Sequence, residues 1–157
     1  MAKFIKATGT VEWAKIFPQN MDTAEKAKDP KMKKQLEEIG GQYIVNFYPD
    51  DPDGYYQMMV ESGVDMKLSG RWVQKDGRHF TKLKRKHIGP FPEAGGPPKV
   101  VDADKNPWDM DENGEIGNGS KVGVVMEKYG SNIRLAAVQV LELVEYDSPD
   151  LEDMLDF

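Results

Sequence analysis

Residues 42–48, with the sequence QYIVNFY, form the stretch that decides the fold class. Tyr43, Val45 and Phe47 occupy every second position, so one face of an extended chain carries the large apolar side chains. A period of two in a run rich in aromatic and β-branched residues predicts a β-strand with one face in the core. Tyr48 has the opposite parity, and we expect it on the outer face of this strand.

Further strands and two short helices are predicted on either side of this stretch. The patterns predict a first strand at 3–17 that bends at Gly9, a hairpin at 71–88 that turns at Asp76-Gly77, and strands at 98–103, 120–129 and 133–146. Helices are expected at 31–39 and 55–62. We therefore predict a mainly β domain, a five-stranded Greek-key barrel of the oligonucleotide-binding (OB) type with a short helix after the second strand.

The composition excludes several classes of protein. The chain of 157 residues contains no cysteine, so disulfides and thiolate metal sites are ruled out and a reducing, intracellular setting is expected. Its first residues lack the apolar segment of a secretory signal, and no apolar run is long enough to span a bilayer. We expect a soluble protein with no cofactor and no membrane partner.

The net charge of −6 is unevenly distributed along the chain. Residues 142–157 hold seven acids and no Lys or Arg, which leaves 20 acids against 21 bases in residues 1–141, a net charge of +1. A second acidic cluster, at 102–115, carries six acids and one Lys. The remainder of the chain is basic, as a surface that binds phosphates needs to be. This distribution indicates a domain at 1–146 followed by a disordered or extended acidic tail at 147–157.

Cations gather on the predicted hairpin. They include Arg71, Arg78, Lys82, Lys84, Arg85 and Lys86, interleaved with Trp72, His79 and Phe80. On a strand the three lysines share one face with Phe80, because side chains alternate with period two. A row of positive charge beside a ring on which a base can stack is typical of proteins that bind single strands without regard to sequence. The alternative is a solvated edge strand that its lysines protect from aggregation.

These patterns predict a binding site for single-stranded DNA (ssDNA). We assign phosphate contacts to Arg71, Lys82, Lys84, Arg85 and Lys86, and base stacking to Trp13, Tyr48, Trp72 and Phe80. Tyr43, Phe47 and Tyr129 are further aromatic candidates, but about half of the aromatic residues on a strand point into the core. Affinity is expected to fall steeply with salt, because bound cationic side chains displace counterions from DNA.

Catalysis has little support in the sequence. Residues 109–116 imitate the start of a calcium-binding EF-hand loop, but the twelfth position, which requires Glu, is Ser120. No nucleophile motif and no metal-binding histidine pattern is present, so we expect neither a metal site nor enzymatic activity. Two rival functions stay open: a structural or adaptor protein that acts only through its tail, and a metal-dependent nuclease that uses the carboxylates of 102–115.

The tail combines acids with spaced apolar residues. Ordinary solubilising tails contain few apolar side chains, whereas this one has Leu151, Met154 and Leu155. We assign partner binding to its acids and its terminal ring: Asp150, Glu152, Asp153, Asp156 and Phe157. A tethered chain of negative charge imitates a phosphate backbone and reaches millimolar effective concentration, so we expect it to compete with DNA. The alternative is a tail that serves only solubility.

Four segments occur in an order that resembles a known family. They are 41–47 with the acidic turn and Met58-Met59-Val60 that follow it, 98–102, 117–122, and the acidic tail that ends in Phe157. This order is similar to that of the ssDNA-binding proteins of bacteriophages with a short-tailed-phage type of replication system. The resemblance implies an OB fold with a basic, aromatic-bearing groove, and a tail that interacts with replication or recombination proteins.

The resemblance also implies a biological setting. It points to a non-enzymatic protein that coats ssDNA without strong sequence preference during phage DNA replication, recombination or repair, in the cytoplasm of the infected bacterium. The implied partners are a polymerase or helicase reached through the tail, and the implied state is a monomer or dimer. The tail is shorter than in parts of this family, and residues 18–40 are unusually charged.

Overall fold

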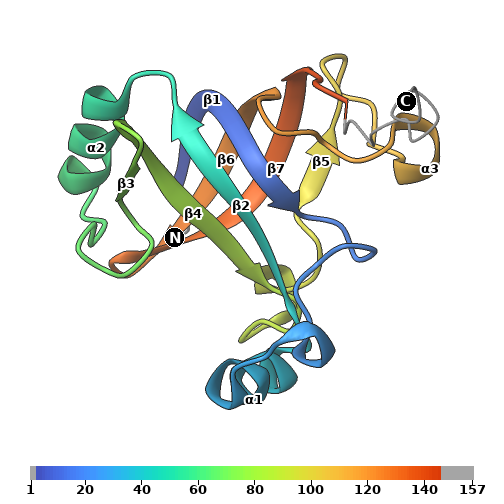
Figure 1. Cartoon of the computed structure of the whole chain (residues 1–157). Helices are drawn as coiled ribbons and strands as arrows, with labels where there is room; N and C mark the ends of the chain where they lie inside the picture. Colours follow the sequence, from blue (N-terminus) through green and yellow to red (C-terminus); the bar gives the residue numbers. More distant parts are fainter. Residues whose placement is uncertain (1–2, 146–157) are drawn as a thin grey trace, which may run out of the picture.

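One seven-stranded sheet forms the body of the protein in a computed structural model that describes residues 3–145 (Figure 1). The strands are β1 (Lys3–Lys15), β2 (Gln42–Pro49), β3 (Val73–Lys75), β4 (Arg78–Lys86), β5 (Lys99–Val101), β6 (Lys121–Tyr129) and β7 (Asn132–Glu142). Their order is β3-β4-β2-β1-β6-β7-β5, with β5 parallel to β7 and the other pairs antiparallel. The mainly β prediction is confirmed, whereas the count of five strands is wrong.

The two additional strands lie at the edges of the sheet. β3 and β5 have three residues each and lie within the predicted hairpin at 71–88 and the predicted strand at 98–103, so the patterns locate both strands and the error is the total of five. β3 joins β4 through a turn in which Asp76 has φ 53° and Gly77 has φ 77°, as a tight hairpin requires. The five longer strands curl so that β4 comes next to β7, although no pairing among the described strands joins these two.

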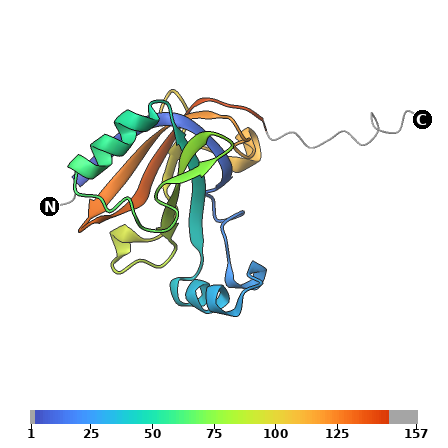
Figure 2. The same cartoon turned by 60° about the vertical axis from the view of Figure 1, so that its left-hand side comes forward.

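Three α-helices connect the strands: α1 (Pro30–Ile39), α2 (Pro52–Glu61) and α3 (Met110–Asn113). α1 begins after Asp29, whose carboxylate accepts a hydrogen bond from the Lys31 amide, and it ends at Gly40 in the left-handed region. It projects away from the sheet (Figures 1 and 2). α2 confirms the helix expected after the second strand. No helix in the described part of the chain is long and apolar enough to cross a membrane.

The core lies inside the curled sheet. Tyr43, Val45 and Phe47 of β2 point inward and are at most 1% exposed, as their alternation predicts. Val45 and Phe47 belong to one apolar cluster with Met59 of α2 and Leu135 of β7. Burial of a side chain of this size contributes roughly 1.5–3 kcal/mol to stability. The central prediction from residues 42–48, a strand with one face in the core, is therefore confirmed.

β1 contains a bulge in its second half. Its pairing with β2 shifts between Glu12 and Lys15, where Trp13 has φ 53°, a conformation that L residues rarely adopt. A side chain at Gly9 is excluded by sterics, because a Cβ at this position would collide with the carbonyl oxygen of Tyr48. Glycine here permits the close approach of two backbones. Gly9 is also where β1 passes from β6, with which it pairs over Lys3–Thr10, to β2, with which it pairs over Gly9–Lys15, so the change of partner falls at the glycine predicted to bend the strand.

Candidate nucleic-acid interface

A basic cleft lies where β4 approaches β7. It has a volume of about 280 Å³. The cations that line it are Arg71, Lys82, Lys84, Arg85, Lys86 and Arg134. No Asp or Glu is among the described residues that line it. The structure thus brings together all five residues predicted to contact phosphate, in a concave site whose excess of positive charge attracts anions.

Three lysines of β4 form a row along this cleft. Lys82, Lys84 and Lys86 are exposed and stand opposite residues 46, 44 and 42 of β2. The pKa of Lys84 is lower than its ordinary value. The larger cause is that neighbouring atoms partly shield the ammonium from water, and the smaller is repulsion by the charges of Lys82 and Arg71. An anion beside Lys84 offsets this repulsion and favours the charged form of the side chain. The geometry is therefore well suited to phosphate contacts by this row, which we call the lysine row.

Arg71 is held in place at the side of the cleft. Its guanidinium donates hydrogen bonds to the backbone carbonyl of Asp65 at 3.3 Å and to Oδ1 of Asn132 at 3.0 Å. These bonds use two of the five N–H groups that a guanidinium offers. Partial burial lowers the pKa of Arg71, but a guanidinium stays charged at neutral pH. Arg71 thus presents a fixed positive charge to the cleft.

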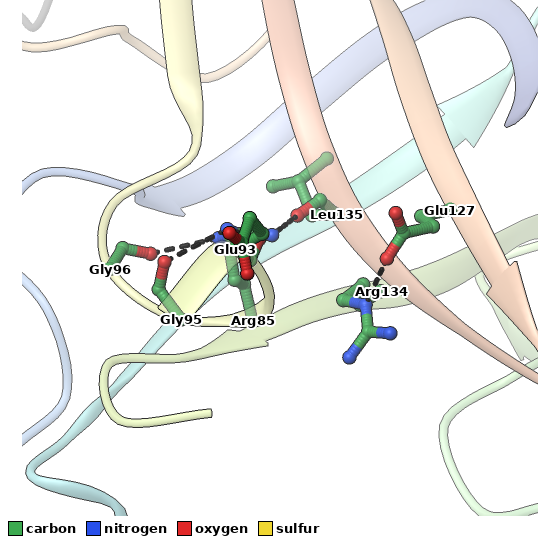
Figure 3. A network of polar contacts seen from close by, with 7 residues as sticks. All are labelled: Arg85, Glu93, Gly95, Gly96, Glu127, Arg134 and Leu135. Carbon is green, nitrogen blue, oxygen red and sulfur yellow. Dashed lines mark hydrogen bonds and ion pairs between the residues drawn. The ribbon is translucent and has the colours of Figure 1, made fainter. Parts of the chain in front are cut away.

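Arg85 differs from the lysines beside it. It donates four hydrogen bonds to backbone carbonyls: to Gly96 at 2.8 Å, Gly95 at 2.9 Å, Glu93 at 3.0 Å and Leu135 at 3.2 Å (Figure 3). Four of its five N–H groups are therefore already bonded. The prediction that Arg85 contacts phosphate needs correction, because this side chain ties β4 to β7 and to the loop at 93–96.

Two of the stacking assignments also need correction. Phe80 and Tyr48 are 5% and 7% exposed, and their ring centroids lie 5.1 Å apart. The Arg78 guanidinium covers the Tyr48 ring at 4.2 Å, and the Tyr48 hydroxyl donates to the Glu12 carboxylate at 3.0 Å. The two rings form a small apolar cluster between β2 and β4. Burial leaves them no ring face to offer to a base.

The two tryptophans assigned to stacking differ in exposure. Trp72 is half-buried and stacks on Tyr55, with 5.7 Å between centroids, and on His79, with 5.0 Å. Trp13 is 61% exposed, and its amide donates to Oδ1 of Asn118 at 2.8 Å. A bulky residue held in the left-handed region is typical of functional sites, where other contacts offset the strain. Among the four predicted stacking residues, Trp13 has by far the most accessible ring.

Sequence reasoning identifies Tyr129 as an aromatic candidate but misses its neighbours Phe91 and Arg134. This guanidinium lies 4.1 Å from the ring centroid of Tyr129 and 5.4 Å from that of Phe91, and its Nε donates to Glu127 at 2.6 Å (Figure 3). Tyr129 and Phe91 are 41% and 49% exposed. Tyr129 carries a signal in the sequence, since it precedes the Gly130-Ser131 turn. Phe91 and Arg134 are isolated in the sequence, and only the fold brings them together.

The carboxylates of 102–115 take part in local turns. Asp102 accepts hydrogen bonds from the amides of Asp104 and Asn106, and Asp109 caps the start of α3. Within residues 3–145, no group of three or more metal-binding side chains comes together. The residues assigned to partner binding, Asp150, Glu152, Asp153, Asp156 and Phe157, lie outside the described residues.

Known structures provide a counterpart for this fold. The single-stranded DNA-binding protein from bacteriophage Enc34 matches with a TM-score of 0.57 over 98% of this chain and 90% of its own, at 12% sequence identity. The fold is similar to that of a phage ssDNA-binding protein. The Enc34 protein in complex with ssDNA matches with a TM-score of 0.53 over 92% of this chain and 89% of its own, also at 12% identity.

Its C-terminally truncated form gives a TM-score of 0.52 over 93% of this chain and 88% of its own, again at 12% identity. No protein-family model matches the sequence, and no curated protein matches it. At this level of identity the likeness is one of fold. It confirms, at that level, the resemblance seen in the order of the sequence segments.

Proposed function

We propose that this protein binds ssDNA without strong sequence preference and coats it during phage DNA replication, recombination or repair. The observation that carries the proposal is the cleft, which six cations and no carboxylate line, with the exposed rings of Tyr129 and Phe91 around Arg134. The shared fold adds support, because one of the similar structures is a phage protein in complex with ssDNA.

The pairing of the five longer strands supports an OB barrel. β1 pairs with both β2 and β6, β2 pairs with β4, and β6 pairs with β7. Arg85 links β4 to β7, at the remaining gap. This connectivity supports a partly open Greek-key barrel, a fold whose second and third strands form the face that binds nucleic acid. β2 and β4 hold these positions, and the lysine row lies on β4.

In this proposal, cations bind the backbone of the strand and rings bind its bases. The lysine row and Arg71 contact phosphates, without sequence preference. Bases stack on Tyr129, Phe91 and Trp13, and stacking is tolerant of sequence because every base has a π face. The bulge at Trp13 lies opposite residues 44–46 of β2, whose other neighbours on β4 are Lys84 and Lys82.

We assign the acidic tail a regulatory role. It competes with ssDNA for the cleft and, once displaced, recruits a polymerase or helicase in the cytoplasm of the infected bacterium. Twelve residues, 146–157, follow Glu145, and an extended chain of this length spans about 40 Å. That is comparable to the diameter of a domain of this size. The tail is therefore long enough to reach a cleft whose charge complements its own.

A titration with oligo-dT, followed by Trp fluorescence, tests the proposal. We expect quenching of Trp13 and an affinity whose logarithm falls with the logarithm of salt by about 0.7 per phosphate contacted. Replacing Lys82, Lys84 and Lys86 together by Gln is expected to lower this slope by about 2. As a matched control, Lys26, Lys28 and Lys31 lie outside the cleft, and their replacement by Gln is expected to leave the slope unchanged.

Four outcomes would contradict the proposal. An affinity that does not depend on salt excludes phosphate binding. Fluorescence that stays constant with oligo-dT, while the tail binds a protein partner, indicates the adaptor function instead. Strand cleavage in the presence of magnesium indicates a nuclease. Equal effects of the two triple variants would show that general charge, and not the cleft, determines binding.

A further inference from the structure

A second concave surface lies on the sheet formed by β1, β6, β7 and β5. We call it the lysine-rimmed face. Its floor includes Gly123, Val125 and Ala137, and its rim carries Lys6, Lys99 and Lys105. It encloses about 700 Å³, and no carboxylate is among the described residues that line it. It shares no lining residue with the cleft, so ssDNA bound in the cleft leaves it accessible.

The floor of this face is open because its side chains are small. Gly123 pairs with Thr8 on one side and Gln139 on the other, and a Cβ at Gly123 would meet no atom within 4 Å. β1, β6, β7 and β5 lie side by side here (Figure 1). A concave apolar floor bordered by charge is typical of a surface that binds another segment or protein. Its occupant should combine apolar side chains with carboxylates.

Residues Leu151–Phe157, with the sequence LEDMLDF, have this combination. Leu151, Met154, Leu155 and Phe157 supply apolar groups, and three acids lie between them. Leu141, near the end of β7, lines the face, and residues 142–145 after it pair with residues 116–120. Five residues, 146–150, separate Glu145 from Leu151, and they span about 17 Å when extended. The segment is thus long enough to turn back over the face of its own chain.

We propose that the lysine-rimmed face is the docking site of Leu151–Phe157 of the same chain after ssDNA has displaced this segment from the cleft. The inference rests on the proposed function, in which tail and ssDNA compete. Docking removes four apolar side chains from water and pairs their neighbouring acids with lysines. It also keeps the displaced tail away from the cleft, so the protein has two alternative tail positions and ssDNA selects between them.

Zero-length cross-linking of the full-length protein tests this. A carbodiimide joins carboxylates to amines that touch, and mass spectrometry identifies the pairs. Without DNA, we expect the tail acids to link to Lys82, Lys84 and Lys86. With a saturating oligo-dT short enough to hold one copy, links to Lys6, Lys99 and Lys105 should rise at least fivefold. No rise at these three lysines would overturn the inference.

Two variants that each add one negative charge make the test specific to the lysine-rimmed face. Gly123→Glu places a carboxylate on the floor in open space, and we expect it to reduce the ssDNA-induced links at least fivefold. Gln35→Glu lies on the exposed surface of α1 and is expected to leave them unchanged. Cross-links that persist in Gly123→Glu would overturn the inference. If this variant does not fold, the cross-links of the unaltered protein still decide the test.

Two further readouts separate the possible failures. Mixing isotopically light and heavy protein shows whether links form within one chain; links between copies would overturn the assignment to the same chain. Oligo-dT binding is measured in the same samples by fluorescence. Absence of binding would contradict the proposed function, whereas normal binding without links to Lys6, Lys99 and Lys105 would contradict only the docking site.

Discussion

At the scale of single residues, Lys84 shows how a binding side chain can weaken the fold that carries it. Partial burial, then the charges of Lys82 and Arg71, lower its pKa, so protonated Lys84 raises the free energy of the folded state. This destabilisation is complete while Lys84 is protonated in both the folded and the unfolded chain. It disappears as the pH rises above the ordinary lysine pKa of about 10.4.

We therefore expect Lys84→Gln to raise the free energy of unfolding at pH 7 by at most about 0.5 kcal/mol, because solvent screens a charge on an exposed side chain, while it weakens oligo-dT binding. The gain in stability should shrink at pH 10. Urea denaturation at the two pH values measures it. Lys67→Gln, outside the cleft, is the control and should change neither quantity. A loss of stability in Lys84→Gln would show that its charge is already paired in the folded protein.

Exposure separates the aromatic residues into two groups. Tyr129, 41% exposed beside Arg134, is available to a base, whereas Phe80, 5% exposed, packs against Tyr48. We expect Tyr129→Leu to weaken oligo-dT binding by about 1–3 kcal/mol, the contribution of one stacked base, with little loss of stability. Phe80→Leu should instead lower the free energy of unfolding by about 1 kcal/mol and leave the affinity within about twofold of its original value.

Fluorescence titration and urea denaturation of both variants measure this difference. The reverse pattern, in which Phe80→Leu lowers the affinity and Tyr129→Leu lowers the stability, would restore the original assignment of Phe80 to stacking. It would also mean that the hairpin of β3 and β4 moves on binding, since Phe80 has no accessible ring face in the folded protein.

At the scale of elements, β4 and β7 are joined by a side chain where a ladder of hydrogen bonds is missing. Arg85 supplies this link through its four bonds to backbone carbonyls. We expect Arg85→Lys to lower the free energy of unfolding by about 2 kcal/mol, because an ammonium cannot reproduce the planar set of donors. Lys86→Arg, on the neighbouring exposed position, is the control. If Arg85→Lys instead left the stability unchanged and weakened ssDNA binding, Arg85 would be a phosphate contact, as the sequence predicted.

The strands also show how far a sequence can predict a site. Alternation correctly places Lys82, Lys84 and Lys86 on one exposed face of β4. The same alternation puts Arg85 on the opposite face of β4, which indicates that Arg85 does not contact phosphate together with the lysines. The burial of Phe80 depends on its neighbours in other strands, Val73 in β3 and Tyr48 in β2. No local pattern specifies those neighbours, because strand pairing is a long-range property.

At the scale of the whole molecule, the separation of charge could be predicted by counting, whereas the cleft could not. Acids concentrate in the tail and at 102–115, and this needs no knowledge of the fold. The cleft forms from segments far apart in the chain, and both Arg134 of β7 and Lys84 of β4 line it. Its position depends on how the sheet curls. For the same reason the contact of Arg134 with Phe91 and Tyr129 emerges only from the folded structure.

Competition between tail and ssDNA makes its own prediction about salt. Deleting residues 147–157 removes five acids and should tighten oligo-dT binding by about tenfold at 50 mM salt but only about twofold at 300 mM, since the screening length shortens with salt. A variant of unchanged length, with Asp150, Glu152, Asp153 and Asp156 replaced by amides, should show nearly the same gain, because charge and not bulk opposes the DNA. Titrations of the three proteins at both salt concentrations measure the effect. An equal gain at both concentrations would indicate that apolar contacts hold the tail in the cleft, and no gain at either would mean that the tail does not compete.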